Sequence, residues 1–306
     1  TGCVGVHFKK FFKIISNDLL YFSYVIQKSS IETNKEPIFP GIDNSIKKNV
    51  LKYLNENRKK NLNKANFIYE NFSPHANCNR MYLTNENALK IDFMRSTINS
   101  WFDKKKISKS EYFYLLSSIV SAVPFVSNIA GTYGAYLKNW DKRSFKTIKL
   151  EKPNIFDNGK KNIVYNEDAN ILIDKIDGDI LYLDPPYNSR QYMPNYHLLE
   201  TIARYDSPIL KGVTGIRQSS SDSKSKYCQK STAEDVLSEL ISKSRFKYVI
   251  LSYSNEGIIP EVNLDKILKS NSKGLFVKNI IPYRRYKRTK DNIGVTLNEL
   301  MYIIKK

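Results

Sequence analysis

The feature that most constrains the fold is a short apolar run that ends abruptly in a carboxylate and two prolines. Residues Asp179 to Asn188 read Asp-Ile-Leu-Tyr-Leu-Asp-Pro-Pro-Tyr-Asn. The first half has the length and composition of a buried parallel strand, and the prolines end it because they cannot donate to a strand ladder. Asp184 is therefore expected at the carboxyl end of the strand, where open α/β sheets bind ligands. An ordinary strand followed by a proline-rich turn is the alternative interpretation.

Further apolar runs indicate additional strands, and helical patterns lie between them. The final two runs, joined by a basic loop, are expected to pair as antiparallel strands at the edge of the sheet. Alternating strands and helices predict an α/β protein whose sheet is mostly parallel, with an antiparallel edge strand. The other expected strands end at Asp18 or cover residues 163–165, 248–252, 274–282 and 297–304.

A polar stretch rich in lysine and asparagine separates two parts of this α/β pattern. Within it, Thr84 is expected to cap a helix, because apolar residues follow it at spacings of three and four. Later residues predict one or two helices that are interrupted near Pro124. A segment of this length is a subdomain rather than a loop. We therefore expect an α/β domain built from residues 1–34 and 150–306, and a helical insertion over residues 35–149.

The chain is strongly basic, with 49 Lys and Arg residues, 30 Asp and Glu residues and a net charge of +19. This charge, combined with 21 Tyr and 15 Phe residues, predicts a polyanionic partner. Nucleic acid is the favoured partner and an acidic membrane surface is the alternative. Nucleotide bias in the source genome would also account for part of the lysine and asparagine content. No apolar run has the length of a transmembrane helix, so none is predicted.

One basic run, from Tyr283 to Lys290, is interleaved with aromatic residues. Its cations are expected to contact nucleic-acid phosphates while its tyrosines stack on bases. A solvated, charged hairpin is the alternative. The cations assigned to this contact are Arg284, Arg285, Lys287 and Arg288.

The cysteines Cys3, Cys78 and Cys228 are far apart and odd in number. They fit neither a disulfide framework nor a Cys-x-x-Cys zinc motif, so reduced thiols and a cytoplasmic location are predicted. His7 and His75 have no partner at metal-ligand spacing, so no metal site is predicted.

The N-terminal residues have the pattern of a turn that approaches a nucleoside cofactor. Gly2 and Gly5 lead into a helix, and the short strand after it ends in Asp18. Glycines let a cofactor approach the backbone, and a carboxylate in this position accepts hydrogen bonds from ribose hydroxyls. For a Gly-x-x-Gly pair alone, a surface turn is the commoner explanation. Because no strand precedes the glycines, the sequence starts inside the motif, and we expect an N-terminally incomplete α/β domain.

Taken together, the Asp-Pro-Pro-Tyr sequence, the Gly-x-x-Gly turn and the Asn17-Asp18 pair resemble DNA adenine methyltransferases. The chain is similar to the subgroup in which a helical region separates the cofactor motif from the Asp-Pro-Pro-Tyr motif. The resemblance implies a Rossmann-like methyltransferase sheet and S-adenosylmethionine as the methyl donor. Other matching segments are residues 131–135, 166–169, 184–192, 196–201 and 252–257.

The resemblance also implies a set of cofactor-binding residues. Asp18 is expected at the cofactor ribose and Asp168 near the cofactor adenine. Gly2 and Gly5 are expected at the edge of the cofactor turn, and Asp184 is expected to adjoin the cofactor as well as the target base. Helix capping is the alternative role for Asp18 and Asp168.

Catalysis is expected from the residues of the Asp-Pro-Pro-Tyr motif. An exocyclic amine conjugated with a purine is a poor nucleophile, because its lone pair is delocalised. By hypothesis, Asp184 accepts one amino hydrogen and the Pro185 carbonyl accepts the other, while Pro186 helps to fix the backbone. Tyr187 is expected to stack on a target base that is rotated out of the duplex. Arg190 is a further candidate for a phosphate or base-edge contact.

These inferences predict a site-specific methyltransferase that modifies adenine in double-stranded DNA. A restriction-modification system is the expected setting, with a cognate restriction endonuclease acting on the same site, and the helical insertion is expected to help select the target sequence. An RNA adenine methyltransferase is one alternative, because the same chemistry serves any conjugated amine. A basic nucleic-acid-binding pseudoenzyme is the other, because an incomplete cofactor motif would leave binding without turnover.

Overall fold

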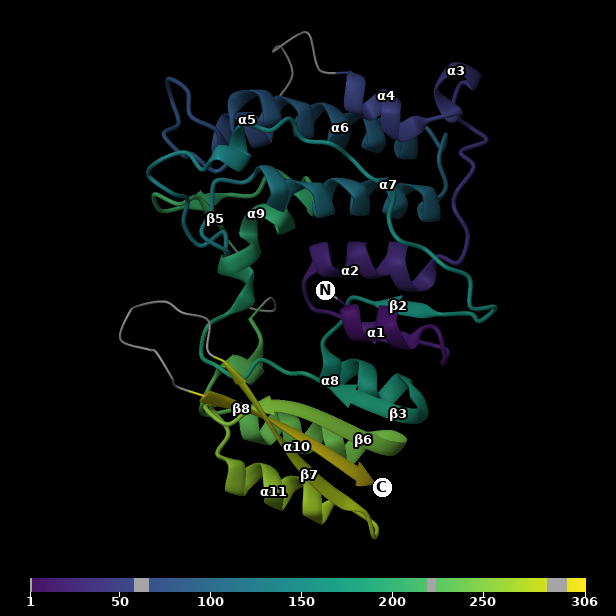
Figure 1. Ribbon diagram of the computed structural model, residues 1–306, viewed down its shortest axis with the longest axis vertical. Helices are drawn as coiled ribbons and strands as arrows, with labels where there is room; N and C mark the ends of the chain where they lie inside the picture. Colours follow the sequence, from purple (N-terminus) through teal and green to yellow (C-terminus); the bar gives the residue numbers. More distant parts are fainter. Residues whose placement is uncertain (1, 58–65, 219–223, 285–295) are drawn as a thin grey trace. The chain divides into compact units, whose positions relative to one another are not determined.

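The computed structural model describes residues 2–57, 66–218, 224–284 and 296–306 (Figure 1). These residues form two compact units. The first unit comprises residues 1–166 and 192–220, and the second comprises residues 167–191 and 221–306.

The first unit is mainly helical. Its elements are α1 (Cys3–Phe8), β1 (Ile15–Asn17), α2 (Tyr21–Gln27), the π-helix η1 (Lys28–Glu32), α3 (Asn44–Lys47), α4 (Val50–Glu56), α5 (Phe67–Phe72), α6 (Asn85–Asp103), α7 (Lys109–Ala122), the 3-10 helices η2 (Val123–Val126) and η3 (Lys142–Phe145), β2 (Ile163–Tyr165), α9 (Tyr192–Arg204), β4 (Leu210–Lys211) and β5 (Ile216–Arg217). Strands β1 and β2 pair in parallel, and β4 and β5 pair antiparallel.

Local sequence signals start the two long helices of the first unit. The Thr84 hydroxyl accepts a hydrogen bond of 3.3 Å from the Asn87 amide, which confirms the predicted cap of α6. Ser108 and Glu111 form a capping box at the start of α7. Pro124 lies in η2, directly after α7 ends, so the predicted interruption is also confirmed.

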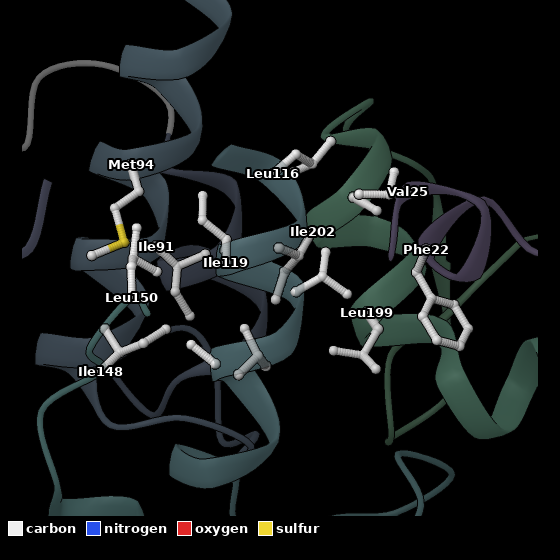
Figure 2. Close-up of a cluster of buried hydrophobic side chains, with 14 of the residues drawn as sticks. Phe22, Val25, Ile91, Met94, Leu116, Ile119, Ile148, Leu150, Leu199 and Ile202 are labelled. Carbon is white, nitrogen blue, oxygen red and sulfur yellow. The ribbon is translucent and has the colours of Figure 1, made fainter. Parts of the chain in front are cut away.

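One hydrophobic core holds the first unit together. Helix α7 contacts α6, α2 and α9, and Figure 1 shows α6, α7 and α2 in successive layers. Two apolar residues of an irregular segment, Ile148 and Leu150, enter the same core (Figure 2). Figure 2 also labels Phe22 and Val25 of α2, Ile91 and Met94 of α6, Leu116 and Ile119 of α7, and Leu199 and Ile202 of α9.

The compact units divide the chain at other positions than the predicted domain boundaries. Residues 1–34, expected in the α/β domain, share the core of the first unit with helices from residues 35–149. The cause is α2, whose buried apolar side chains pack against α7 and α9. The division into a methyltransferase domain and a helical insertion stays a prediction from sequence pattern.

The second unit consists of a four-stranded sheet with helices. Its elements are α8 (Ala169–Leu172), the 3-10 helix η4 (Ile173–Lys175), β3 (Asp177–Leu183), the 3-10 helix η6 (Lys226–Cys228), α10 (Ala233–Lys243), β6 (Arg245–Ser254), α11 (Glu261–Ser270), β7 (Phe276–Arg284) and β8 (Thr296–Lys305). The strand order is β3-β6-β8-β7. Strands β3 and β6 are parallel, and β8 runs antiparallel to both β6 and β7.

One face of this sheet packs against α10 and α11. Leu251 of β6 and Tyr302 of β8 are register partners, and both join a core with Leu237 of α10 and Leu268 of α11. Because successive side chains of a strand point to opposite faces, Ser252 of β6 points away from this core. The opposite face of the sheet is therefore the one that carries polar side chains near the carboxyl end of β6.

Two details of the predicted sheet are corrected. The four-stranded sheet is not mostly parallel, because only β3 and β6 pair in parallel among its described strands, while β8 runs antiparallel to both of its neighbours. The last two strands do form an antiparallel pair at the edge of the sheet, as predicted, with β7 outermost. Strand β3 is parallel to β6 as expected, yet it is not buried, since Ile180 is 44% and Tyr182 is 38% exposed. Among the described strands, β3 pairs with β6 alone.

Candidate active site

Asp184 follows directly after β3, at the carboxyl end of the strand, as the sequence predicts. The residue is exposed, and among the described residues none donates a hydrogen bond to its carboxylate. Protein atoms nevertheless crowd the carboxyl group, and this partial desolvation raises its pKa above the ordinary aspartate value. The negative charge of Glu299 raises the pKa further. Asp184 is thus a carboxylate with unused acceptor positions and increased basicity.

The two prolines and Tyr187 are held in place by a neighbouring loop. The Ile258 amide donates a hydrogen bond of 2.8 Å to the Tyr187 carbonyl, which ties the Asp-Pro-Pro-Tyr loop to the loop that follows β6. Within the described part of the chain, no group donates to the Pro185 carbonyl. The pyrrolidine rings of Pro185 and Pro186 restrict the backbone torsions between these points. The loop therefore presents the carbonyl oxygen of Pro185 in a fixed position beside Asp184.

Two polar residues lie near Asp184: Ser252, which belongs to the matching segment 252–257 but was assigned no role, and Glu299, which was not found from the sequence. Leu183 is the register partner of Leu251, so the next residue of β6, Ser252, lies beside Asp184. The Ser252 hydroxyl donates a hydrogen bond of 2.5 Å to the Glu299 carboxylate on β8. The available signal for Ser252 was the alternation of Ser252 and Ser254 with Tyr253 at the end of an apolar strand. Glu299 had no local signal, because only the pairing of β6 with β8 brings it to this point.

The segment after Tyr187 is anchored by side chain to backbone hydrogen bonds. The Asn188 side chain accepts from the Arg190 amide at 3.0 Å. Gln191 exchanges two hydrogen bonds with the backbone of Ser225, at 3.0 and 2.9 Å. The Arg190 side chain itself is exposed, so an ordered turn presents its guanidinium group to solvent.

The predicted glycines lie at the start of the first unit, where they allow close helix packing. Gly2 has a φ of +75°, and a Cβ atom there would lie 2.6 Å from Cγ of Gln27. A Cβ atom on Gly5 would lie 2.8 Å from Cδ1 of Ile31. Both positions therefore require glycine for packing of α1, whatever further role they have.

Asp18 stabilises the turn that leads into α2, but it does not cap this helix, whose N-cap residue is Leu20. Its carboxylate accepts from the Leu20 amide at 2.9 Å and from the Ser23 hydroxyl at 2.5 Å. The Ser23 hydroxyl in turn accepts from the side chain amide of Gln27, at 3.0 Å. Because Gln27 also packs against Gly2, the structure brings Gly2 and Asp18 into one connected group through Ser23 and Gln27.

Asp168 caps α8 in the second unit. Its Oδ1 accepts from the Asn170 amide at 2.8 Å, and the residue is exposed. An ionised carboxylate offers about four acceptor positions, so the hydrogen bonds described leave both Asp168 and Asp18 able to accept from further donors. The chemistry of these groups therefore fits the hydroxyl and amino donors of a nucleoside.

The remaining predicted nucleic-acid contacts are only partly described. Arg284 is the last residue of β7 and pairs in register with Thr296 of β8. Arg285, Lys287 and Arg288 lie outside the described residues. Across the described residues, no group of three or more His, Cys, Asp or Glu side chains is arranged to hold a metal ion. Cys3, Cys78 and Cys228 are each free thiols.

His197, the second residue of the matching segment 196–201, has a structural role. It is fully buried in the first unit, and its Nε2 lies 2.8 Å from the Tyr133 carbonyl, to which it donates as a neutral ring. The Tyr82 hydroxyl lies 3.2 Å from the same nitrogen. Burial lowers the pKa of His197 to about 4. A neutral histidine in the core has no part in binding a ligand at the surface.

These observations define a mixed α/β protein in which Asp184, an exposed carboxylate with a raised pKa, lies at the carboxyl end of a parallel strand. This is the position where such folds bind nucleoside ligands. Residues 1–267 match the family described as D12 class N6 adenine-specific DNA methyltransferase. The chain belongs to this family. In the part of the chain that the structure describes, none of the helices has the length and apolar character needed to cross a membrane.

Several curated proteins are similar to this chain. The Type II methyltransferase M.FokI of Planomicrobium okeanokoites is 47% identical over 100% of this chain and 47% of its own length. The modification methylase StsI of Streptococcus sanguinis is 43% identical over 100% of this chain and 46% of its own length. The Type II methyltransferase M.NlaIII of Neisseria lactamica is 38% identical over 95% of this chain and 82% of its own length. The chain thus spans about half the length of the first two relatives. No solved structure matches it significantly.

Proposed function

We propose that this chain transfers a methyl group to the exocyclic amino group of adenine at a specific site in duplex DNA. One observation carries the proposal. Asp184, the residue after β3, is exposed, has a raised pKa and receives no hydrogen bond from the described residues, beside a Pro185 carbonyl that is equally available. Two acceptors at adjacent residues suit an amino group, which carries two hydrogens. The family and the names of its relatives support the same reaction.

The proposed chemistry depends on orientation of the amine. Asp184 accepts one amino hydrogen and the Pro185 carbonyl accepts the other, so the nitrogen becomes tetrahedral and regains its lone pair. The raised pKa of Asp184 strengthens its hydrogen bond as positive charge develops on the nitrogen. Holding the nitrogen in this geometry supplies much of the acceleration, and no covalent protein intermediate is needed.

Tyr187 is proposed to stack on the target base. Tyr187 is 36% exposed, and the hydrogen bond from the Ile258 amide to the Tyr187 carbonyl fixes the backbone that carries the ring. Rotating a base out of a duplex costs roughly a few kcal/mol, and stacking on an aromatic ring offsets part of that cost. Arg190 and the basic run from Arg284 to Arg288 are proposed to contact DNA phosphates.

The family implies a methyl donor, and we propose S-adenosylmethionine. When bound, this cofactor supplies an electrophilic methyl group on a sulfonium. Asp18 is proposed to accept from its ribose hydroxyls and Asp168 from its adenine, using the acceptor positions that their present hydrogen bonds leave unused. Gly2 and Gly5 are proposed to border the same site.

The setting of the reaction is also a proposal. The names of the relatives support a modification enzyme of a restriction-modification system, with a cognate endonuclease that acts on the same DNA site. Cellular DNA as the substrate favours a cytoplasmic location. The family supports a Rossmann-like methyltransferase arrangement for the α/β part of the chain.

The test is transfer of radiolabelled methyl from S-adenosylmethionine to duplex DNA, single-stranded DNA and RNA of the same sequence, followed by nucleoside analysis. We expect labelled N6-methyladenine from the duplex, in amounts that saturate with the number of target sites. Label that is found only in RNA would establish the RNA methyltransferase alternative. Salt-sensitive DNA binding without any label in nucleosides would establish the pseudoenzyme alternative instead.

A further inference from the structure

A segment of the first unit has no part in the site described above, although it carries a dense charge. Residues 138–149 hold five cations and one acidic residue, Asp141, and their only regular structure is the short helix η3. Among the described residues, no carboxylate forms an ion pair with the lysines of this segment. The cations are Lys138, Lys142, Arg143, Lys146 and Lys149.

Two buried asparagine side chains fix the backbone of this segment. Asn128 donates to the Leu137 carbonyl at 2.9 Å and accepts from the Asp141 amide at 2.9 Å. Asn87 donates to the Lys146 carbonyl at 2.9 Å and accepts from the Ile148 amide at 2.8 Å. Each asparagine satisfies donors and acceptors that a helix or strand would otherwise satisfy, so the irregular backbone is ordered.

The end of the segment is anchored in the hydrophobic core. Ile148 is 1% and Leu150 is 2% exposed, and Figure 2 shows both side chains beside those of Ile91 and Met94 of α6. The Leu150 amide also donates to the Asn55 side chain at 2.7 Å. This anchoring resembles that of a core element more than that of a surface loop.

This segment and the neighbouring helix η2 hold large aromatic side chains at the surface. Phe145 is 65% exposed, and its ring centroid lies 5.8 Å from that of Trp140. Phe125 on η2 is 74% exposed, and η2 contacts η3, which ends at Phe145. Leaving such rings in water costs free energy of hydration, so a rigid scaffold that exposes them beside lysines fits a binding surface.

We propose that this surface binds DNA, with its lysines on phosphates and its rings against a base. The aromatic-basic surface consists of Phe125, Lys138, Trp140, Lys142, Phe145 and Lys146. Cations interleaved with exposed aromatic rings match a polyanion that carries stacking faces, whereas a protein partner would call for fewer lysines. The inference rests on the proposed function and adds a DNA contact within the first unit.

The electrostatic part of the proposal is tested by salt dependence. Affinity for a fluorescent DNA duplex is measured between 50 and 200 mM KCl for the double variant Lys142→Gln/Lys146→Gln. Each lost phosphate contact lowers the slope of log affinity against log salt by about 0.9, so the slope should fall by roughly 2. The matched control is Lys47→Gln/Lys48→Gln, which removes two exposed lysines of the same unit near α3 and should keep the wild-type slope.

The stacking part is tested at Phe145 and Trp140. Phe145→Ala should weaken binding about tenfold, while Phe145→Trp, which keeps an aromatic face, should bind like the wild type. The chain has two Trp residues, so Trp101→Phe leaves Trp140 as the only tryptophan fluorophore. Duplex or single-stranded DNA should then quench its emission, because a stacked base quenches an indole.

Unchanged salt slopes in the Lys142→Gln/Lys146→Gln variant, together with unquenched Trp140 fluorescence at saturating DNA, would overturn the proposal and assign the surface to a protein partner. These binding measurements do not depend on turnover. A chain that binds DNA as expected but labels no adenine would contradict the proposed function alone, and a chain that labels adenine with unchanged slopes would contradict only this inference.

Discussion

Two carboxyl groups lie near the end of β3, but only that of Asp184 is proposed to touch the target base. Glu299 is held by the Ser252 hydroxyl and acts on Asp184 through its negative charge. Desolvation and this charge both raise the pKa of Asp184, so the carboxylate loses its acceptor form at a higher pH than an ordinary aspartate does. The decrease of kcat/KM for methyl transfer on the acidic side of its pH profile therefore reports on Asp184 and Glu299.

Glu299→Gln should move the acidic limb of kcat/KM for methyl transfer to lower pH. Removing the negative charge lowers the pKa of Asp184, so the ionised form persists to lower pH. Ser252→Ala should shift the limb less, because the charge of Glu299 is retained. A limb that stays in place in Glu299→Gln, or moves to higher pH, would show that Glu299 does not influence Asp184.

His197 makes the stability of the first unit depend on pH. Its pKa is about 4 in the folded chain, against an ordinary value of 6.5, so the unfolded chain binds a proton that the folded chain does not. Stability is therefore complete above pH 6.5 and falls as the pH decreases toward 4, by a total on the order of 3 kcal/mol. Urea unfolding at pH 7 and pH 5 should show this loss, and His197→Gln should reduce the difference between the two pH values.

At the scale of elements, a buried carboxylate joins two helices of the first unit. Glu200 of α9 accepts from the amides of Tyr21 and Phe22, at 3.1 and 2.9 Å, and thereby caps the start of α2. Arg204 donates to the same carboxylate at 2.7 Å. Because Glu200 is fully buried, these donors have no water to replace the carboxylate.

Glu200→Gln should lower the free energy of unfolding of the first unit by about 2 kcal/mol, since the charge-assisted hydrogen bonds from two amides and from Arg204 are weakened. Glu86→Gln is the matched control, because Glu86 lies in the first turn of α6 and is exposed, and it should change stability far less. Equal effects of the two substitutions, measured by urea unfolding, would contradict the capping role of Glu200.

Signals from adjacent residues predicted most helices and strands, but not which of these elements pair or pack together in space. The Thr84 cap, the break at Pro124 and the strand before Asp184 depend on adjacent residues, and each was visible in the sequence. The sequence predicted that the last two strands pair at the edge, but the place of β8 between β6 and β7 depends on pairing over long sequence separations, so which of the two is outermost was not predicted. For the same reason Glu299 was missed, although the Asp-Pro-Pro-Tyr motif itself was found.

At the scale of the whole molecule, a net charge of +19 fits an enzyme that acts on DNA. The charge does not select a face by itself, because lysines are spread along the whole chain. The aromatic-basic surface adds the exposed rings that a solvated charged face lacks. Family membership and the acceptors at Asp184 and Pro185 connect this charge to a reaction on a base.

The central claim is that Asp184 orients the adenine amino group, and the single-turnover rate of methyl transfer by Asp184→Asn tests it most directly. The substitution keeps the size of the side chain but replaces an ionised acceptor with an amide. We predict a fall of at least about 100-fold in the rate of labelled N6-methyladenine formation, with duplex affinity within about twofold of the wild type. A rate close to that of the wild type would contradict the account.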